Sequence, residues 1–293
     1  MITIRGSGFG LYGYLPAVIS HGVVLPFRYK NKLAQMPQAR VLSDRVHWVA
    51  DDQTALEQAD SIIIAIPPKH QPTVAQAALA LLNINRVVLE KPLAPTPTTA
   101  LELLDRLEDS GKEFRINYTF RFTDWGEQLL RNKYKDKLTI EWRFMAHHFK
   151  HQLHNWRRDA ATGGGALRFY GIHLVALLAE MGYSTVITSE TDTESARWEA
   201  TLAGSHLPNC HLLIDTMATQ DKFTVTAGST TLANQASVFS ITDPNFDMRV
   251  PALVKLYASF STQQPDWYRA AILLWKNLER TNGYPEIEAF RGL

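Results

Sequence analysis

The sequence predicts an α/β protein with an N-terminal, doubly wound parallel sheet over residues 1–117 and a C-terminal α+β domain over residues 118–293. Two observations predict the parallel sheet: short apolar runs alternate with helical segments, and a glycine-rich turn follows the first run. A third observation predicts an open, largely antiparallel sheet in the second domain. Beyond residue 118, runs that alternate apolar with polar residues replace the continuous apolar ones.

Composition limits the classes of partner. The net charge of +1 favours neither nucleic acid nor a membrane surface, and we expect neither as a partner. No run approaches the roughly 20 apolar residues that span a bilayer. The single cysteine, Cys210, excludes an intrachain disulfide and fits a reducing cytoplasm. The chain enters a strand without a basic or long apolar leader, so we expect a cytoplasmic protein without a signal peptide.

A glycine turn follows the strand predicted over residues 1–5. Gly6 can form the tight turn and Gly8 can let the backbone approach a pyrophosphate. The third glycine of a Gly-x-Gly-x-x-Gly pattern stays open, because that position is Leu11 in one register and Gly13 in the other. A flexible turn without a ligand is the alternative. The candidate pyrophosphate-binding residues are Gly6, Ser7, Gly8, Phe9 and Gly10.

Basic residues follow the second predicted strand, residues 23–27. An NAD enzyme usually has an acidic residue about 20 residues past the glycines to bind the ribose. Here Arg28, Lys30 and Lys32 occupy that region, and no acidic residue occurs before Asp44. Cations suit the 2′-phosphate of NADP, so we predict NADP as the cofactor, with NAD less favoured. A solvated basic loop is the alternative.

The remaining elements of the first domain end in turns that can face a cofactor. Strands are predicted over residues 46–49, 61–66, 87–89 and 113–117, and helices over 54–59, 71–82 and 97–110. Because ligands bind at the carboxyl ends of parallel strands, we expect cofactor contacts there. The candidates are Ile66, Pro67, His70, Glu90 and Lys91. His70 as a helix-start residue and Lys91 as a surface lysine are the alternatives.

The second domain is predicted to contain helices over residues 124–133, 166–181 and 267–278. Its strands are predicted over 138–144, 197–202, 210–217 and 223–227, with 230–238 as an extension. Four histidines, at positions 147, 148, 151 and 154, match no standard metal spacing. The stretch that contains them has no cysteine and no acidic residue. We therefore expect no metal and a polar, aromatic lining for a substrate.

A second diagnostic stretch begins with Gly163, Gly164 and Gly165. Three glycines let the backbone pass close to another element or to a ligand. His173 follows early on an apolar helix, where an imidazole could take a hydroxyl proton near pH 7. A hydrogen-bonded packing histidine is the alternative.

In this order, the glycine turn, Ala65-Ile-Pro-Pro-x-His70, Glu90-Lys-Pro92 and Gly163-Gly-Gly…His173 resemble the Gfo/Idh/MocA oxidoreductases, the glucose-fructose oxidoreductase and inositol dehydrogenase family. The resemblance covers about residues 1 to 182. It implies an NAD(P)-binding Rossmann domain, a small-molecule substrate on the open face of the second sheet, and a homo-oligomer formed through that sheet. It also implies that Lys91 and His173 are catalytic. The implied substrate-binding residues are Arg121, Trp156, Arg157, Phe169, Tyr170 and His173.

One departure from the family pattern bears on activity. The family's Asp-x-x-x-His motif has Phe169 in place of the aspartate here. Either Lys91 and His173 suffice, or the substrate is unusual, or oxidation has been lost. We predict an NADP-dependent oxidoreductase of a sugar-like or other small carbonyl or hydroxyl compound, acting as a reductase because Phe169 makes the site apolar. A non-catalytic NAD(P)-binding sensor or partner-binding protein is the alternative, and the retained Lys91 and His173 favour the enzyme.

Overall fold

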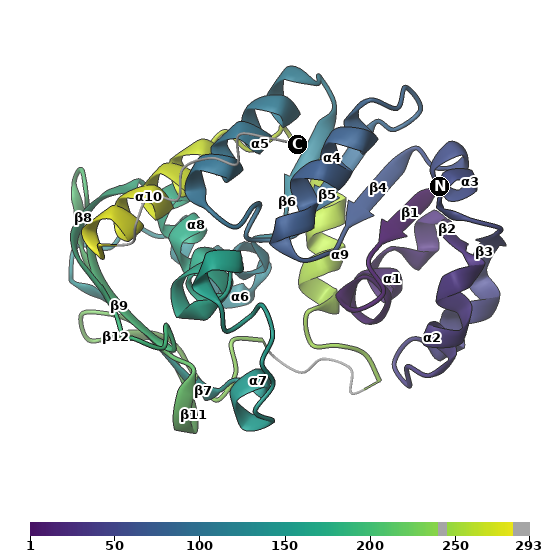
Figure 1. The fold of residues 1–293 in the computed structure, drawn as a ribbon. Coiled ribbons are helices and arrows are strands. Elements are labelled where there is room, and N and C mark those ends of the chain that lie inside the picture. The colour runs from purple at the N-terminus through teal and green to yellow at the C-terminus, as the bar shows by residue number, and fades with distance from the viewer. Residues whose placement is uncertain (240–244, 284–293) are drawn as a thin grey trace. The chain divides into compact units, whose positions relative to one another are not determined.

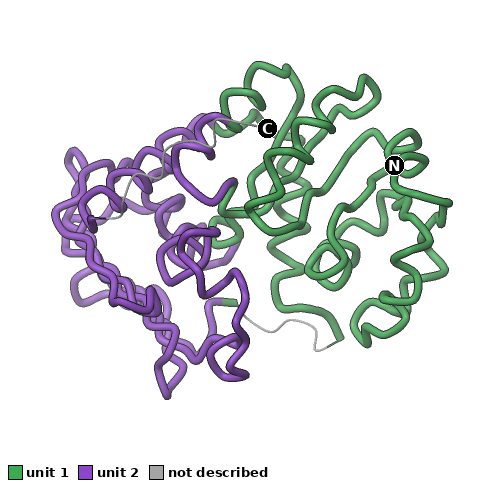
Figure 2. Tube along the Cα trace, viewed as in Figure 1, with its two compact units in different colours: residues 1–93, 103–122, 239–265 green, residues 94–102, 123–238, 266–293 purple. Residues whose placement is uncertain are grey.

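The structure, a computed structural model, describes residues 1–239 and 245–283 (Figure 1). The chain forms two compact units, each of which contains separate segments of the sequence (Figure 2). The first unit comprises residues 1–93, 103–122 and 239–265, and the second comprises 94–102, 123–238 and 266–293. No helix in the described ranges is long and apolar enough to cross a membrane.

The first unit contains the predicted parallel sheet. Its strand order is β3-β2-β1-β4-β5-β6, and every neighbouring pair is parallel. The strands are β1 (Ile2–Arg5), β2 (Val23–Pro26), β3 (Val46–Val49), β4 (Ser61–Ile64), β5 (Arg86–Leu89) and β6 (Glu113–Ile116). Chain order reverses direction between β1 and β4, which is where doubly wound sheets bind ligands at their carboxyl ends. The prediction of a doubly wound sheet is confirmed.

Short helices connect these strands. They are α1 (Leu15–Val18), α2 (Lys30–Ala34), α3 (Asp52–Gln58), α4 (Gln71–Leu79) and α5 (Pro97–Asp109). A π-helical turn, Gly10–Tyr14, precedes α1, so regular helix begins at Leu15 and Pro16 lies in its first turn. Proline is tolerated there because its missing N–H would have no partner within the helix.

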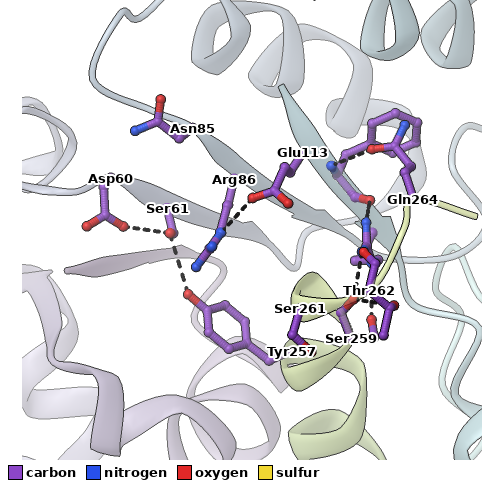
Figure 3. Close-up of polar contacts among 12 residues, drawn as sticks. Asp60, Ser61, Asn85, Arg86, Glu113, Tyr257, Ser259, Ser261, Thr262 and Gln264 are labelled. Atoms are coloured by element: carbon purple, nitrogen blue, oxygen red, sulfur yellow. Dashed lines mark hydrogen bonds and ion pairs between the residues drawn. The ribbon is translucent and has the colours of Figure 1, made fainter. Parts of the chain in front are cut away.

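Residues 239–265 belong to the first unit, although the sequence analysis included them in a domain of residues 118–293. Their helix, α9 (Val250–Ala258), was not predicted from the sequence. The physical reason is burial: Leu253, Leu256 and Tyr257 pack into the same apolar core as β1 and α1. The Arg115 guanidinium donates to Ser259 Oγ (3.1 Å) and to the carbonyl oxygen of Ser259 (2.7 Å), which fixes the end of this segment against β6. Figure 3 labels Ser259 at this end of the segment.

The second unit contains a mixed sheet of order β12-β11-β7-β10-β9-β8. Its strands are β7 (Leu138–Met145), β8 (Tyr183–Thr191), β9 (Arg197–Gly204), β10 (Leu207–Asp215), β11 (Met217–Ala227) and β12 (Thr230–Gln235). Only β7 and β10 pair in parallel among these strands, so the prediction of a largely antiparallel sheet is confirmed. The edge strand β8 was not predicted, because most of its residues are exposed and its apolar pattern is weak.

Helices cover one face of this sheet. The helices of the second unit are α6 (Asp124–Arg131), α7 (His147–Lys150), α8 (Ile172–Met181) and α10 (Tyr268–Thr281). Helix α8 is buried on all sides over residues 172–179, which explains its continuous apolar sequence. Helix α10 packs against α8 and β8. A second π-helical turn, Ala166–Gly171, leads into α8 and carries Phe169 and Tyr170.

Candidate cofactor and substrate sites

The glycine loop leaves β1 with a conformation that requires glycine at its first position. Gly6 has φ +140°, and a Cβ there would overlap the carbonyl oxygen of Ala65. Gly8 is exposed, and no atom lies within 4 Å of the position its Cβ would take. These two glycines therefore fit the roles predicted for them, a tight turn and an open approach for a pyrophosphate.

The structure decides which glycine packs against the sheet. A Cβ on Gly10 would lie 2.8 Å from Ile4 Cγ2 on β1, so Gly10 provides the close approach of helix to strand. A Cβ on Gly13 would overlap the Phe9 ring, so Gly13 makes room for Phe9. Leu11 is fully buried. The two spacings considered from the sequence placed the third glycine position at Leu11 or at Gly13. The structure instead places the packing glycine at Gly10.

Arg28 is connected to the glycine loop through Tyr29. Arg28 Nη2 donates to the Tyr29 hydroxyl (2.8 Å), and that hydroxyl accepts from the Gly6 N–H (3.3 Å). Arg28 Nη2 also donates to Asp52 Oδ1 (2.7 Å), and Arg5 Nη1 lies 2.6 Å from the same oxygen. The hydrogen bond with Asp52 raises the pKa of Arg28. Sequence reasoning missed Asp52 because this residue begins α3, one strand beyond the segment where an acidic residue was sought.

The other two predicted cations, Lys30 and Lys32, make different contacts. Lys32 Nζ donates to Ser7 Oγ (2.9 Å) on the glycine loop. Lys30 Nζ lies over the rings of Phe27 (5.7 Å) and Trp48 (5.9 Å) instead. Of the two lysines, Lys32 is the one that the structure joins to the loop.

One buried side chain holds the backbone on both sides of Lys91. Gln71 Nε2 donates to the carbonyl oxygens of Glu90 (3.1 Å) and Pro92 (2.9 Å), and Gln71 Oε1 accepts from the Glu90 N–H (2.9 Å). The Lys91–Pro92 peptide is cis. Sequence reasoning missed Gln71, although its position at the start of α4, directly after His70, was a usable signal.

The Glu90 carboxylate joins three elements of the first unit. Its Oε1 accepts from the Tyr14 hydroxyl (2.7 Å) and from Asn117 Nδ2 (2.7 Å). Burial, followed by the nearby Glu90 charge, raises the pKa of Tyr14 well above its ordinary value, so the hydroxyl stays protonated and donates. Glu90 therefore ties the π-helical turn after the glycine loop to the turn that carries Lys91.

The remaining predicted cofactor residues follow β4. Ile66 and Pro67 are half-buried, and His70 is exposed where α4 begins. Arg249, which the sequence did not single out, lies at the start of α9 with its Cζ 4.1 Å from the Phe9 ring. Its guanidinium also forms a two-point ion pair with Asp247 (2.7 and 2.8 Å).

In the second unit, the three glycines seat a neighbouring loop. A Cβ on Gly164 would overlap the carbonyl oxygen of Trp156, and the Gly165 N–H donates to the carbonyl oxygen of Arg157 (2.8 Å). Of the two purposes considered for these glycines, the structure shows close packing against another segment. The glycines therefore fix the backbone that carries Trp156 and Arg157.

Four of the six predicted substrate residues meet in one aromatic cluster. Phe169 packs edge-on against Trp156 (5.2 Å between centroids) and Tyr170 (4.7 Å). The Arg157 Cζ lies 5.1 Å from the Trp156 ring and 5.7 Å from the Phe169 ring. Tyr170 also contacts two aromatic side chains of β7, Trp142 and Phe144.

The other two predicted substrate residues lie outside this cluster. His173 is buried on α8 of the second unit. Arg121 belongs to the first unit, where its Cζ lies 5.4 Å from the Phe122 ring. Of the predicted catalytic pair, Lys91 belongs to the first unit and His173 to the second.

The histidine segment differs from a metal site. His148 is buried, and burial lowers its pKa from 6.5 to about 4, with further lowering by Arg157, Arg158 and His147. The His147 and His151 rings contact each other at 4.4 Å. Within the described ranges, no group of three or more histidine, cysteine or acidic side chains could hold a metal ion.

Comparison with known proteins gives a family match over part of the chain. The model of the Gfo/Idh/MocA family, described as "Oxidoreductase family, NAD-binding Rossmann fold", matches residues 28–118. That match includes Glu90 and Lys91 and agrees with the motifs read from the sequence. It confirms the prediction of an NAD(P)-dependent oxidoreductase family. No curated protein matches the sequence.

Solved structures of similar fold extend over nearly the whole chain. A myo-inositol dehydrogenase from Corynebacterium glutamicum has a TM-score of 0.70 at 15% identity, with 96% of each chain covered. The WlbA dehydrogenase from Bordetella pertussis, in complex with NADH and UDP-GlcNAcA, has a TM-score of 0.69 at 17% identity, with 96% of this chain and 95% of that chain covered. A 3-ketoreductase from Actinomadura kijaniata, in complex with NADP and TDP-benzene, has a TM-score of 0.65 at 12% identity, with 96% of each chain covered. At these identities the similarity establishes the fold.

Proposed function

We propose that this chain, which belongs to the Gfo/Idh/MocA oxidoreductase family, is an NADP-dependent reductase of a sugar-like or other small carbonyl compound. The observation that carries the proposal is the Glu-Lys-Pro turn. Gln71 fixes the backbone before and after Lys91, at the carboxyl end of a buried strand of the parallel sheet. A lysine held in this way suits a substrate oxygen better than a surface role.

The residues of the first unit fit a dinucleotide. Gly6 and Gly8 form a loop with room for a pyrophosphate, and the loop precedes the turn of residues 10–14. Arg28 and Lys32, both bonded to loop-side partners, would bind the 2′-phosphate. NADH and NADP both occur in similar structures, so the preference for NADP rests on these two cations. When bound, the nicotinamide supplies the hydride.

In this proposal the Lys91 ammonium donates a hydrogen bond to the carbonyl oxygen of the substrate. Negative charge develops on that oxygen during reduction, and a donor aimed at developing charge contributes about 3 kcal/mol to the stability of the transition state. The Lys91 Nζ proton can then move to the oxygen. His173 is the other residue that the family resemblance makes catalytic, and its imidazole can exchange a proton with a hydroxyl group.

Phe169 supports the direction of reaction. Its ring packs among Trp156, Tyr170 and the Arg157 guanidinium, in the position where the family motif has a carboxylate. With Phe169 at this position, no carboxylate is available there to accept the proton of a substrate alcohol. An apolar wall suits a neutral carbonyl group instead.

The test is a substrate screen that follows NADPH absorbance with purified protein. The panel contains sugar ketones, aldehydes and the corresponding alcohols, with NADPH or NADH for reduction and NADP or NAD for oxidation. We expect NADPH-dependent reduction of one or more carbonyl compounds and slower or no oxidation of alcohols. Tight NADPH binding without turnover on the whole panel would favour a non-catalytic NAD(P)-binding sensor.

The Phe169→Asp variant tests the assigned direction. We expect slower reduction, because a poorly solvated carboxylate would stand beside the substrate, together with a gain in alcohol oxidation. The Phe169→Leu variant keeps the site apolar and is the matched control. Faster reduction by Phe169→Asp than by wild type would contradict the assignment.

The proposal retains the predicted homo-oligomer, formed through the sheet of the second unit. Light scattering on the purified chain measures its mass directly, and a monomer at working concentration would contradict this part.

A further inference from the structure

Residues 147–159 of the second unit contain three cations, Lys150, Arg157 and Arg158. No carboxylate in the described ranges lies within ion-pair distance of them. The nearest acidic residue in sequence is Asp159. Its Oδ1 accepts from the Ala161 N–H (2.9 Å), and its Oδ2 accepts from the Thr162 hydroxyl (3.0 Å). The Asp159 carboxylate is therefore bonded to neutral donors of residues 161 and 162 rather than to the guanidinium of Arg157 or Arg158.

The two guanidinium groups are held against aromatic rings. Arg157 lies over Trp156 and Phe169, and the Arg158 Cζ lies 4.3 Å from the Phe149 ring. Stacking uses the face of a guanidinium and leaves its N–H edge for an anion. The side chains are thereby ordered before any ligand arrives, which lowers the entropy lost on binding.

The backbone that carries these arginines is also fixed. The Gly164 N–H donates to the carbonyl oxygen of Asp159 (2.9 Å), and the Gly165 N–H donates to that of Arg157 (2.8 Å). Side-chain bulk at Gly164 would displace this segment. Gly164 and Gly165 therefore hold a loop whose arginines form no ion pair with any residue that the structure describes.

The buried histidine of this segment adds no charge near neutral pH. His148 is buried beside the two arginines, and its pKa of about 4 leaves it uncharged near neutral pH. His147 and His151 flank it and contact each other. Within the part of the chain that the structure describes, no carboxylate pairs with Arg157 or Arg158, so their N–H groups are available to a ligand.

We propose that Arg157 and Arg158 bind an acidic group of the substrate, a phosphate or a carboxylate attached to a sugar-like ring. The ring packs on the aromatic cluster next to Phe169, and the acidic group receives N–H donors from the two guanidiniums. This inference rests on the proposed function, because it assigns the substrate class of the same site.

The experiment compares three sugars that differ only at carbon 6: glucose 6-phosphate, glucuronate and glucose. Ligand-observed NMR measures their binding to the full chain saturated with NADPH, so that the cofactor site does not capture the anions. We expect both acids to bind and glucose to bind at least tenfold more weakly. A tenfold ratio of dissociation constants corresponds to about 1.4 kcal/mol of binding free energy. A preference between the two acids identifies phosphate or carboxylate as the natural group.

Variants assign the binding to these residues. Arg157→Gln and Arg158→Gln should each weaken binding of the acids by about tenfold and leave glucose unchanged. Arg131→Gln removes an exposed arginine of the same unit, ion-paired with Glu127, and should have no effect. Circular dichroism checks that all three variants are folded.

Three outcomes would overturn the inference: absence of binding by both acids, glucose binding as tightly as the acids, or equal weakening by Arg131→Gln. Failure of the proposed function looks different. It would leave salt-dependent binding of the acids, sensitive to Arg157→Gln, in a protein that oxidises no NADPH.

Discussion

Lys91 owes its position to contacts made by its neighbours in the chain. Gln71 fixes the peptide groups on either side of it, and Glu90 is held by Tyr14 and Asn117. A lysine on a fixed backbone can meet a substrate oxygen at small entropic cost, because the peptide groups on either side of it are already ordered.

This placement predicts the effect of Lys91→Ala. Turnover should fall by about 10²-fold or more while NADPH still binds, since a donor to the developing charge is lost. His173→Ala should cost less, because Phe169 provides no carboxylate to pair with the imidazole. Lys133→Ala, an exposed lysine of the second unit, is the control. Full activity of Lys91→Ala on the true substrate would remove the proposed proton donor.

Cofactor preference depends on Arg28 in the same way. The Arg28→Asp variant should narrow or reverse a preference for NADP over NAD, because a carboxylate repels the 2′-phosphate and accepts ribose hydroxyls. Fluorescence titration with both cofactors measures the ratio of affinities. Lys30→Asp makes the same charge change on a residue that lies over Phe27 and Trp48, and it should alter the ratio less. Equal affinity of the wild-type protein for both cofactors would contradict the prediction.

Among single residues, those whose role depends on a local motif could be predicted from the sequence. Gly6 could be predicted because the tight turn after β1 requires glycine, and Gly8 has open space around it, as a close approach to a ligand needs. Gln71, Asp52 and Arg249 could not, because each acts through contacts with residues distant in the sequence. The spacing of the glycines also does not predict that Gly10 is the one that packs against β1, because this depends on the backbone conformation of the loop.

Among the elements, the π-helical turn Ala166–Gly171 positions the aromatic cluster and is itself anchored by a buried ion pair. Arg168 Nη2 donates to Glu279 Oε2 on α10 (2.8 Å), and Arg168 Nη1 donates to the carbonyl oxygen of Ala160. Both side chains are buried. Trp275 Nε1 donates to the same carboxylate, so one glutamate joins the turn to α10.

Breaking this pair should therefore destabilise the fold. Glu279→Gln leaves the Arg168 charge buried and should lower the free energy of unfolding by about 3–5 kcal/mol. The double variant Arg168→Met with Glu279→Leu removes both charges and should recover most of that loss. Urea unfolding followed by circular dichroism measures both. Equal stability of Glu279→Gln and wild type would show that the pair does not anchor the turn.

The elements that the sequence predicted well are those buried on both faces. Residues 62–64 and 87–89 are buried, and their continuous apolar runs identified them. Strand β8 is mostly exposed and was missed for that reason. A π-helical turn differs from an α-helix by one residue per turn, and apolar periodicity over five or six residues does not distinguish the two.

Considering the whole molecule, the chain leaves the first unit and returns to it at residues 239–265. The apolar side chains of α9 that are buried there would fit either unit by composition. Only the contacts of Leu253 and Leu256 with the core around β1 decide the matter. A single boundary predicted at residue 118 cannot describe a chain that returns to its first unit.

A buried histidine makes the stability of the whole protein depend on pH. In the folded protein the pKa of His148 is about 4, lowered from 6.5 mainly by burial. Between these two values the unfolded chain binds a proton that the folded protein does not, so the free energy of unfolding decreases as the pH falls from 6.5 to about 4. The full effect of such a shift is about 3 kcal/mol.

The His148→Gln variant should therefore be less sensitive to acid than wild type. Urea unfolding just above pH 6.5 and near pH 4 measures the change in unfolding free energy for each protein. We expect wild type to lose up to about 3 kcal/mol more than His148→Gln across this interval. His154 is exposed, so His154→Gln controls for loss of a histidine and should behave like wild type. An identical loss in wild type and His148→Gln would show that the His148 imidazole is protonated equally in the folded and unfolded chains, and that the neighbouring arginines do not act on it.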